Sequence, residues 1–349
     1  MPAETRFRIA GFLAVLGLTA GFAALASPAR AQGSVVLYCG VQEEWCRAMS
    51  SAFERETGIK VAMTRKSSGE NYAQVKAEAA NPRGDIWWGG TGDPFFQAAE
   101  EGLTVEYKSP MLDQLHDWAV RQWEQTKQRV VGVYSGALGV GYNAKLLKSK
   151  GIPEPKCWAD LLDAKLQDEV QVADPNSSGT AYTLLATMVQ IMGEDKAFGY
   201  LKALHKNVNQ YTKSGAAPAK AVSLGETGVG IAFMHDMIAI AVENPDVKTV
   251  APCEGTGYEI GSMSIIKGAK NLDNAKKFYD FALKPGPQAL GAENKQFQVP
   301  SNKTASIPPL APKLSELKLI DYDFAKYGSS DERRRLLSKW DREVKSLAK

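Results

Sequence analysis

A strand that runs into a short polar turn and then into a helix recurs four times in this sequence. The four units are 61–63 into 67–70, 85–88 into 89–94, 170–173 into 174–180, and 230–234 into His235-Asp236. Strands that alternate with helices through short connections predict an α/β fold, with a parallel sheet and helices on its faces. In such sheets ligands bind beyond the carboxyl ends of the strands, which is where these turns lie.

The third turn, with the sequence NSSGT at 176–180, is the sharpest candidate for a binding site. Ser177, Ser178, Gly179 and Thr180 place three hydroxyl groups and a glycine where a helix begins. The first N–H groups of a helix have no partner within it, and the helix dipole is positive there, so such a turn favours an anion. A single turn of this kind is more often an ordinary helix cap. A binding site therefore requires that several of these turns meet in space.

Two long extended stretches divide the chain. Residues 129–143 (RVVGVYSGALGVGYN) and 256–267 (TGYEIGSMSIIK) are punctuated by glycine and lack a helical period. We interpret them as strands that cross from one lobe to another and back, so that the lobes form a clamshell with a cleft between them. This interpretation predicts lobe 1 at 32–134 and 260–310, lobe 2 at 135–259, and a helical C-terminal tail at 311–349 that packs on the lobes.

Residues 1–31 have the features of a signal peptide, which predicts export to the periplasm. Arg6 and Arg8 precede an apolar run, and Ala29-Arg30-Ala31 fits an A-x-A cleavage site. A retained membrane anchor is the alternative, but the run is short for a span and is interrupted by glycines. Removal of the leader, with Arg6, Arg8, Arg30 and Glu4, lowers the net charge from +3 to about +1. A nearly neutral chain gives no electrostatic footprint for nucleic acid.

Four cysteines follow the leader, an even number in an oxidising compartment. They allow three pairings, of which we favour Cys39–Cys46, across a strand-to-helix turn, with Cys157–Cys253. Free buried thiols and a metal site are the alternatives. We expect no metal, because there is no CxxC spacing and the sequence has only three histidines. We expect no cofactor either, because the GxG runs lack the spacing of a dinucleotide-binding fold.

The order of these elements in an exported chain resembles the periplasmic solute-binding proteins of ABC importers. The resemblance is to the branch that includes ferric-ion, polyamine, phosphonate and hexose-phosphate binders, and it covers essentially the whole mature chain. The stretches 85–103 (DIWWGGTGDPFFQAAEEGL), 214–236 and 252–271 are most similar to the hexose-phosphate-binding subgroup. The resemblance implies a type II clamshell fold, a small anionic solute, a membrane permease as partner and a monomeric protein.

The resemblance also implies which residues contact the solute. Ferric-ion binders of this branch commonly carry two adjacent tyrosines where this chain has His235-Asp236, and hard Fe(III) prefers anionic oxygen ligands, so iron is disfavoured. His235 and Asp236 resemble the sugar-contacting pair of the hexose-phosphate binders, and Glu259 resembles a third hydroxyl-binding position. The turn at Ser67-Ser68 and the turn at 177–180 would then hold the phosphate from opposite lobes. Thr91 is a further candidate phosphate contact.

The residues support the same interpretation without the family. Helix starts rich in Ser, Thr and Gly indicate an oxyanion, and His235, Asp236 and Glu259 indicate a ligand with several hydroxyl groups. A sugar phosphate has both features. A 2-aminoethylphosphonate is the runner-up, because the carboxylates could hold an amine, and ferric iron and polyamines follow. An enzyme is disfavoured, since the chain has no nucleophile elbow, P-loop or HExxH motif. Trp87 and Trp88 alternate across a strand, so one is expected in the core and one could face the cleft.

Overall fold

Strands that alternate with helices build one mixed sheet of ten strands in the computed structural model, which describes residues 33–348. The predicted signal peptide lies outside the described residues. The strands are β1 Ser34–Cys39, β2 Lys60–Arg65, β3 Ile86–Thr91, β4 Val131–Asn143, β5 Val170–Ala173, β6 Val208–Thr212, β7 Val229–Phe233, β8 Val247–Val250, β9 Tyr258–Ile265 and β10 Val299–Pro300.

Thirteen α-helices accompany the strands within the same residues. They are α1 Glu43–Thr57, α2 Ser68–Ala77, α3 Asp93–Glu100, α4 Asp117–Gln125, α5 Ala144–Ser149, α6 Gly179–Met192, α7 Glu194–His205, α8 Ala217–Leu224, α9 Met234–Glu243, α10 Leu272–Ala282, α11 Pro285–Glu293, α12 Phe324–Tyr327 and α13 Ser330–Trp340. A π-helical turn at Asp341–Lys345 follows α13. No helix in the described part of the chain is both long and apolar enough to span a bilayer.

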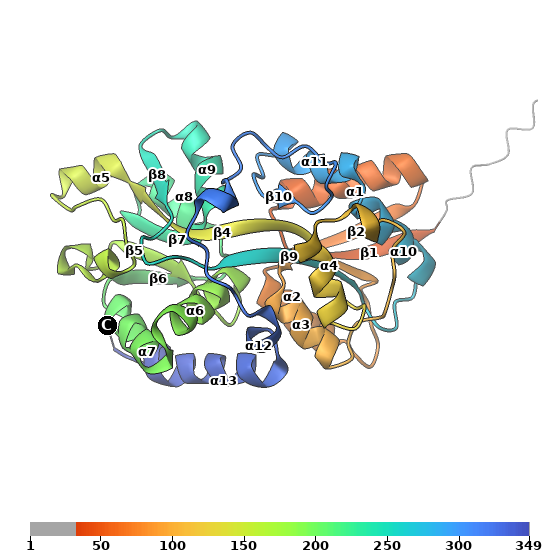
Figure 1. Ribbon diagram of the computed structural model, residues 1–349, viewed down its shortest axis with the longest axis horizontal. Helices are drawn as coiled ribbons and strands as arrows, with labels where there is room; N and C mark the ends of the chain where they lie inside the picture. Colours follow the sequence, from red (N-terminus) through yellow and green to blue (C-terminus); the bar gives the residue numbers. More distant parts are fainter. Residues whose placement is uncertain (1–32, 349) are drawn as a thin grey trace, which may run out of the picture. The chain divides into compact units, whose positions relative to one another are not determined.

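The strand order β2-β1-β3-β9-β4-β7-β5-β6 confirms the two crossings. Parallel pairs join β2, β1 and β3 on one side, and β7, β5 and β6 on the other. Between them β4 and β9 run antiparallel to each other and to their outer neighbours (Figure 1). β4 pairs with β9 and β10 over its first half and with β7 and β8 over its second, so it belongs to both strand groups. The described residues form one compact unit, so the predicted lobe boundaries remain a prediction.

Local sequence explains the helix bounds where they follow the prediction. α1 has Glu43 and Glu44 in its first turn and Arg55 in its last, which complements the helix dipole. It ends at Gly58, which adopts the left-handed conformation (φ 71°) and donates its N–H to Glu54, as expected of a glycine after a helix.

The sequence pattern also predicts helices at 158–163 and 237–242, and both differ from the structure. The helix predicted at 158–163 is a 3-10 helix at Ala159–Leu162. The helix predicted from Met237 begins three residues earlier, at Met234, so His235 and Asp236 lie in the first turn of α9 instead of before it. Met234 lies at the junction of strand and helix, and an apolar residue fits the pattern of either element. The sequence pattern therefore does not show where the strand ends and the helix begins.

Trp87 and Trp88 are both in the core, on opposite faces of β3. Neither side chain lines the candidate ligand pocket described below. Trp87 is fully buried and stacks on Phe95 with ring centroids 3.7 Å apart. Trp88 is 2% exposed and meets the Trp45 ring edge-on at 5.1 Å. The expectation that one could face the cleft was wrong, because β3 lies between β1 and β9 and helices cover both of its faces.

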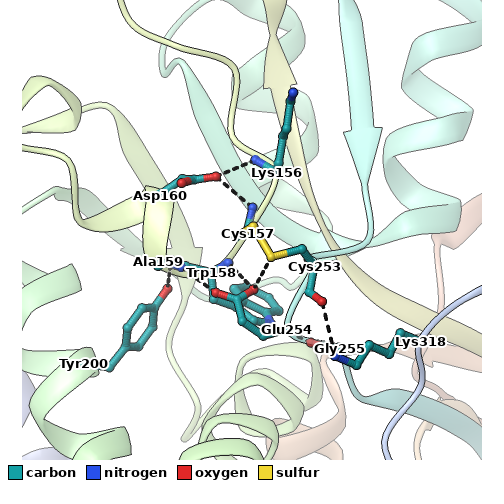
Figure 2. Close-up of a disulfide and its surroundings, with 10 residues drawn as sticks. All are labelled: Lys156, Cys157, Trp158, Ala159, Asp160, Tyr200, Cys253, Glu254, Gly255 and Lys318. Atoms are coloured by element: carbon teal, nitrogen blue, oxygen red, sulfur yellow. Dashed lines mark hydrogen bonds between the residues drawn. A yellow bond between two sulfur atoms is a disulfide. The ribbon is translucent and has the colours of Figure 1, made fainter.

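Two disulfides join the four cysteines in the pairing favoured from the sequence, Cys39–Cys46 and Cys157–Cys253. Cys39 and Cys46 are fully buried between β1 and α1. Cys253 is exposed, and its neighbour Glu254 accepts backbone hydrogen bonds from Trp158 and Ala159 at 2.8 and 2.9 Å (Figure 2). The second disulfide and Glu254 together fasten two segments that are distant in the sequence.

Candidate ligand-binding site

One pocket gathers residues from both strand groups and from the two crossing strands. Nine of the ten predicted ligand contacts line it: Ser67, Ser68, Thr91, Ser178, Gly179, Thr180, His235, Asp236 and Glu259. β2 and β3 bring the first three to the pocket, β5 the next three, β7 the His-Asp pair and β9 the glutamate. The turns singled out in the sequence therefore meet at one place.

Five helices begin at this pocket. The residues at their N-terminal caps all line it: Gln42 before α1, Ser67 before α2, Ser178 before α6, Ala216 before α8 and Phe233 before α9. Each helix start carries backbone N–H groups without an acceptor inside the helix and a partial positive charge. The pocket is consequently suited to hold an anion.

Several polar groups in or near this lining already have hydrogen-bond partners within the protein. The Ser68 hydroxyl accepts the Thr91 N–H at 3.1 Å, and the Tyr134 hydroxyl accepts the Gly90 N–H at 2.8 Å. The Thr91 hydroxyl, in contrast, is buried and has no hydrogen-bond partner among the described residues. A buried hydroxyl without a partner is costly, which makes Thr91 Oγ1 a group that a ligand would satisfy.

Ser177 is the one predicted contact that does not line the pocket. Its hydroxyl donates to the backbone carbonyls of Lys213 at 3.1 Å and Asp174 at 3.3 Å. Its own carbonyl accepts the Gly69 N–H at 3.0 Å. Ser177 thus holds two turns together instead of pointing its hydroxyl into the pocket, a distinction that the string NSSGT does not contain.

The same pocket contains a cluster of buried titratable groups. His235 Nε2 lies 3.8 Å from Asp236 Oδ2 and 3.8 Å from Glu259 Oε1, and all three side chains are less than a tenth exposed. Asp236 Oδ1 also accepts a hydrogen bond from the Gln42 amide. His235 Nδ1 has no hydrogen-bond partner among the described residues.

Burial sets the protonation of this cluster. It lowers the pKa of His235 to about 3 and raises the pKa of Asp236 to about 7, although the charges of Arg65 and Lys220 oppose the latter rise. Burial also raises the pKa of Glu259 well above its ordinary value, and the nearby charges of Asp236 and Asp93 add to this rise. Burial therefore favours the neutral imidazole of His235 and the protonated form of both carboxyl groups. Groups of this kind both donate and accept, which is what hydroxyl groups need.

Sequence reasoning missed other lining residues, among them Gln42, Arg65, Tyr134, Gly215 and Gln298. Arg65 is the cation in this lining, and its Nε donates to the Val41 carbonyl at 2.8 Å. Arg65 is the last residue of β2, two positions before Ser67. Its position at a strand end could therefore have predicted that it lines the pocket. Tyr134 and Gln298 gave no such signal, because Tyr134 lies inside β4 and Gln298 lies in the loop before the short strand β10.

Comparison with known proteins decides the family. Residues 90–327 match the model of a family described as bacterial extracellular solute-binding protein. The chain belongs to this family. Such solute-binding proteins take up small solutes and work with the permeases of ABC importers, and the fold is that of the type II periplasmic binding proteins.

Three relatives of this solute-binding protein are similar over nearly their whole length. The periplasmic binding protein AfuA from Actinobacillus pleuropneumoniae, solved with exogenous fructose-6-phosphate bound, is 47% identical with a TM-score of 0.86, and the match covers 90% of this chain and 100% of AfuA. The periplasmic binding protein P5PA is 38% identical with a TM-score of 0.87, at the same coverage. A Haemophilus influenzae protein is 46% identical over 95% of this chain and 96% of its own.

Proposed function

We propose that this solute-binding protein captures a hexose monophosphate and delivers it to the permease of an ABC importer. The observation that carries the proposal is the composition of one pocket, whose lining combines helix starts with buried imidazole and carboxyl groups. In this proposal the helix starts form an anion-binding end, and His235, Asp236 and Glu259 form a hydroxyl-binding end. In this proposal the protein acts in the periplasm as a monomer, after removal of residues 1–31, and catalyses no reaction.

The phosphate would bind where the helices α2, α6 and α8 begin. The N–H groups of Gly179 and Thr180, the first two residues of α6, have no acceptor within the helix. The unpartnered Thr91 hydroxyl and the Arg65 side chain line the same pocket. A phosphate monoester carries about 1.5–2 negative charges at pH 7, and charge-assisted hydrogen bonds from such donors are the strong ones.

The sugar would bind at His235, Asp236 and Glu259. A neutral imidazole donates and accepts, and carboxyl groups whose pKa burial has raised can do the same, so these three side chains can match the donors and acceptors of neighbouring hydroxyl groups. The similarity to AfuA, which is solved with fructose-6-phosphate, supports the same class of ligand.

A second candidate is a small aminophosphonate. The anion-binding end would hold the phosphonate, and Asp236 and Glu259 would hold the amine if its charge drew both carboxyl groups into the ionised form. Ferric iron is less suited, because Tyr134 is the single tyrosine among the lining residues and its hydroxyl accepts the Gly90 N–H.

Calorimetric titration of the purified, ligand-stripped protein tests the proposal. Glucose 6-phosphate, fructose 6-phosphate, inorganic phosphate, 2-aminoethylphosphonate, spermidine and ferric citrate would be titrated separately. We expect tight binding of a sugar phosphate and at most weak binding of inorganic phosphate. Tight binding of the aminophosphonate, with no heat from either sugar phosphate, would overturn the proposal.

The variant Asp236→Ala sharpens this test. It should weaken sugar-phosphate binding more than tenfold, since a buried hydroxyl group left without its hydrogen-bond partner costs roughly 1–3 kcal/mol. Binding of inorganic phosphate should not change, because Asp236 lies at the hydroxyl-binding end. An unchanged affinity for the sugar phosphate would remove this residue from the site.

A further inference from the structure

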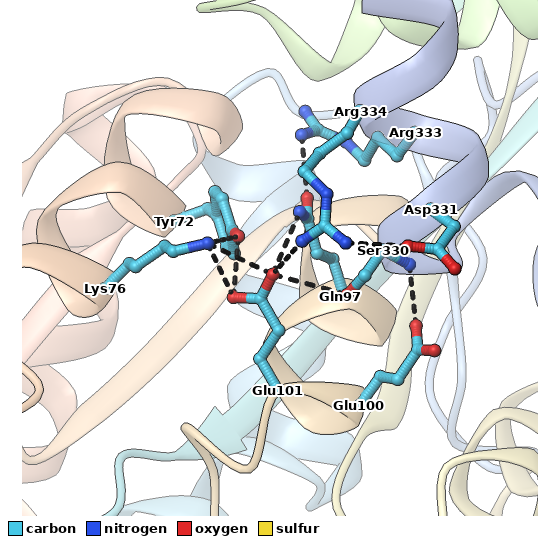
Figure 3. Close-up of polar contacts among 9 residues, drawn as sticks. All are labelled: Tyr72, Lys76, Gln97, Glu100, Glu101, Ser330, Asp331, Arg333 and Arg334. Atoms are coloured by element: carbon cyan, nitrogen blue, oxygen red, sulfur yellow. Dashed lines mark hydrogen bonds and ion pairs between the residues drawn. The ribbon is translucent and has the colours of Figure 1, made fainter.

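The C-terminal segment 320–345, here named the strap, contacts both strand groups. In Figure 1 the helix α13 of the strap runs along the lower edge of the molecule, from α3 and α12 to α7. On the side of the first strand group, the Ser330 N–H donates to Glu100 at 2.6 Å, Arg333 donates to Gln97 at 3.0 Å, and Arg334 donates to Glu101 at 3.1 Å (Figure 3).

The next turn of α13 reaches the second strand group. Arg335 donates two hydrogen bonds to the Glu194 carboxylate, at 2.9 and 2.7 Å, and Lys339 donates a third at 2.7 Å. Glu194 is the first residue of α7. Successive turns of one helix therefore hold two parts of the protein that the crossing strands also join.

The strap also contacts the segment that follows Thr91. The Tyr322 hydroxyl donates to Asp93 Oδ1 at 3.1 Å, and both side chains are buried. Asp93 is the first residue of α3 and follows Thr91 by two positions. The strap thus contacts the start of α3 without lining the ligand pocket, since neither Asp93 nor Tyr322 is among the lining residues.

The end of the strap holds the turn that precedes Ser178. Lys345 Nζ donates to Asp174 Oδ2 at 2.5 Å, and Asp341 Oδ1 accepts the Asn176 amide at 2.9 Å. Asp174 in turn organises the turn, since its carbonyl accepts the Ser177 N–H at 3.2 Å and the Ser178 N–H at 2.8 Å. Lys345 and Asp341 therefore contact the residues that set the position of Ser178, without lining the pocket themselves.

We propose that the strap positions two parts of the phosphate site through residues outside the pocket lining. Tyr322 acts on the start of α3, and Lys345 acts on the turn before α6. This inference rests on the proposed function, in which Thr91 and the α6 start contact phosphate. The strap sets the spacing between these groups before the ligand arrives, so that binding does not have to order them. Lys345 is a positioning residue, because it acts on the ligand through Asp174.

A positioning role for Lys345 predicts weaker binding without a loss of stability, whereas a purely structural role predicts a loss of stability. The Lys345 and Asp174 side chains are 48% and 15% exposed, and partly exposed ion pairs contribute little to stability. Lys345→Met should accordingly leave the melting temperature nearly unchanged. It should nevertheless speed hydrogen exchange of the amides at 177–181 and weaken glucose 6-phosphate binding about fivefold. Lys345→Arg, which keeps the charge, should restore both.

Lys313→Met is the matched control, because it removes the exposed ion pair of Lys313 with Glu316, which lies outside the strap. It should change neither exchange at 177–181 nor affinity. The positioning role would be overturned if Lys345→Met left either the exchange at 177–181 or the affinity unchanged. It would also be overturned if Lys345→Arg did not restore the lost affinity. If the unaltered protein binds no sugar phosphate, the proposed function fails. The exchange rates of the ligand-free variants then still decide whether the strap holds the turn.

Discussion

The backbone N–H of Gly69 donates a 3.0 Å hydrogen bond to the carbonyl oxygen of Ser177. Gly69 lies in the first turn of α2, and Ser177 lies just before α6, so this bond joins two of the turns that surround the pocket. It also satisfies one of the N–H groups that a helix start leaves without a partner. The approach is close, because a Cβ atom at Gly69 would lie 2.4 Å from the Asn176 carbonyl oxygen.

We therefore expect Gly69→Ala to separate the two turns and to weaken ligand binding at least tenfold, a loss of about 1.4 kcal/mol. Backbone atoms line the approach and cannot rotate away as a flexible side chain would. Calorimetric titration with glucose 6-phosphate measures the effect. Gly199→Ala in α7 is the control, since a Cβ atom there meets nothing within 4 Å and Ala favours a helix. Equal affinity of the two variants would contradict the prediction.

Thr91→Val should weaken ligand binding without destabilising the ligand-free protein. The Thr91 hydroxyl has no partner in this structure, so its loss removes no internal hydrogen bond, whereas a ligand phosphate would lose a donor worth roughly 1.5–3 kcal/mol. Melting temperature and affinity are measured together. The comparison is Thr183→Val in α6, which also removes a buried hydroxyl without a partner, but away from the pocket. That variant should bind normally, and a loss of affinity in it alone would refute the assignment.

Asp236→Asn should stabilise the ligand-free protein by an amount that grows between about pH 4 and pH 7. Burial raises the pKa of Asp236 to about 7 from an ordinary 3.8, so in this range the folded chain holds a proton that the unfolded chain has released. The free energy of unfolding contributed by Asp236 then falls as the pH rises. Asparagine carries no such proton and removes this dependence.

His235 contributes in the opposite direction. Burial lowers its pKa to about 3 from an ordinary 6.5, so between these values the unfolded chain binds a proton that the folded chain does not, and stability rises with pH. His235 therefore offsets part of the fall in stability that Asp236 contributes where the two ranges overlap. Denaturant unfolding at several pH values would test this. A constant difference between Asp236→Asn and the unaltered protein across the range would contradict the assignment to Asp236.

The disulfide Cys157–Cys253 should be the more easily reduced of the two. Cys253 is exposed, whereas Cys39 and Cys46 are fully buried. Its loss should be costly, because it closes a loop of 96 residues and the chain-entropy model gives about 4.7 kcal/mol for a loop of this length. Mass spectrometry after mild reduction and alkylation would identify the opened pair, and denaturant unfolding of Cys157→Ala with Cys253→Ala would measure the cost. Alkylation of Cys39 first would contradict this order.

The sequence by itself determined the units of this fold and most of the residues around the pocket. Strand runs, polar turns and helix stops are local patterns, so β5 spans the predicted residues 170–173 and α1 ends just before Gly58. The carboxyl ends of parallel strands share one edge, so turns far apart in the sequence could be predicted to meet there.

Only the tertiary structure decided where individual side chains point. Ser177 and Ser178 are neighbours of the same type, but the Ser177 hydroxyl is taken by the Lys213 carbonyl and Ser178 lines the pocket. The side chains of Trp87 and Trp88 are both buried, because helices cover both faces of β3. The contact of Lys345 with Asp174 has no counterpart in any local pattern. Such choices depend on which groups approach from distant parts of the chain, and a pattern that reports on a few neighbouring residues does not contain them.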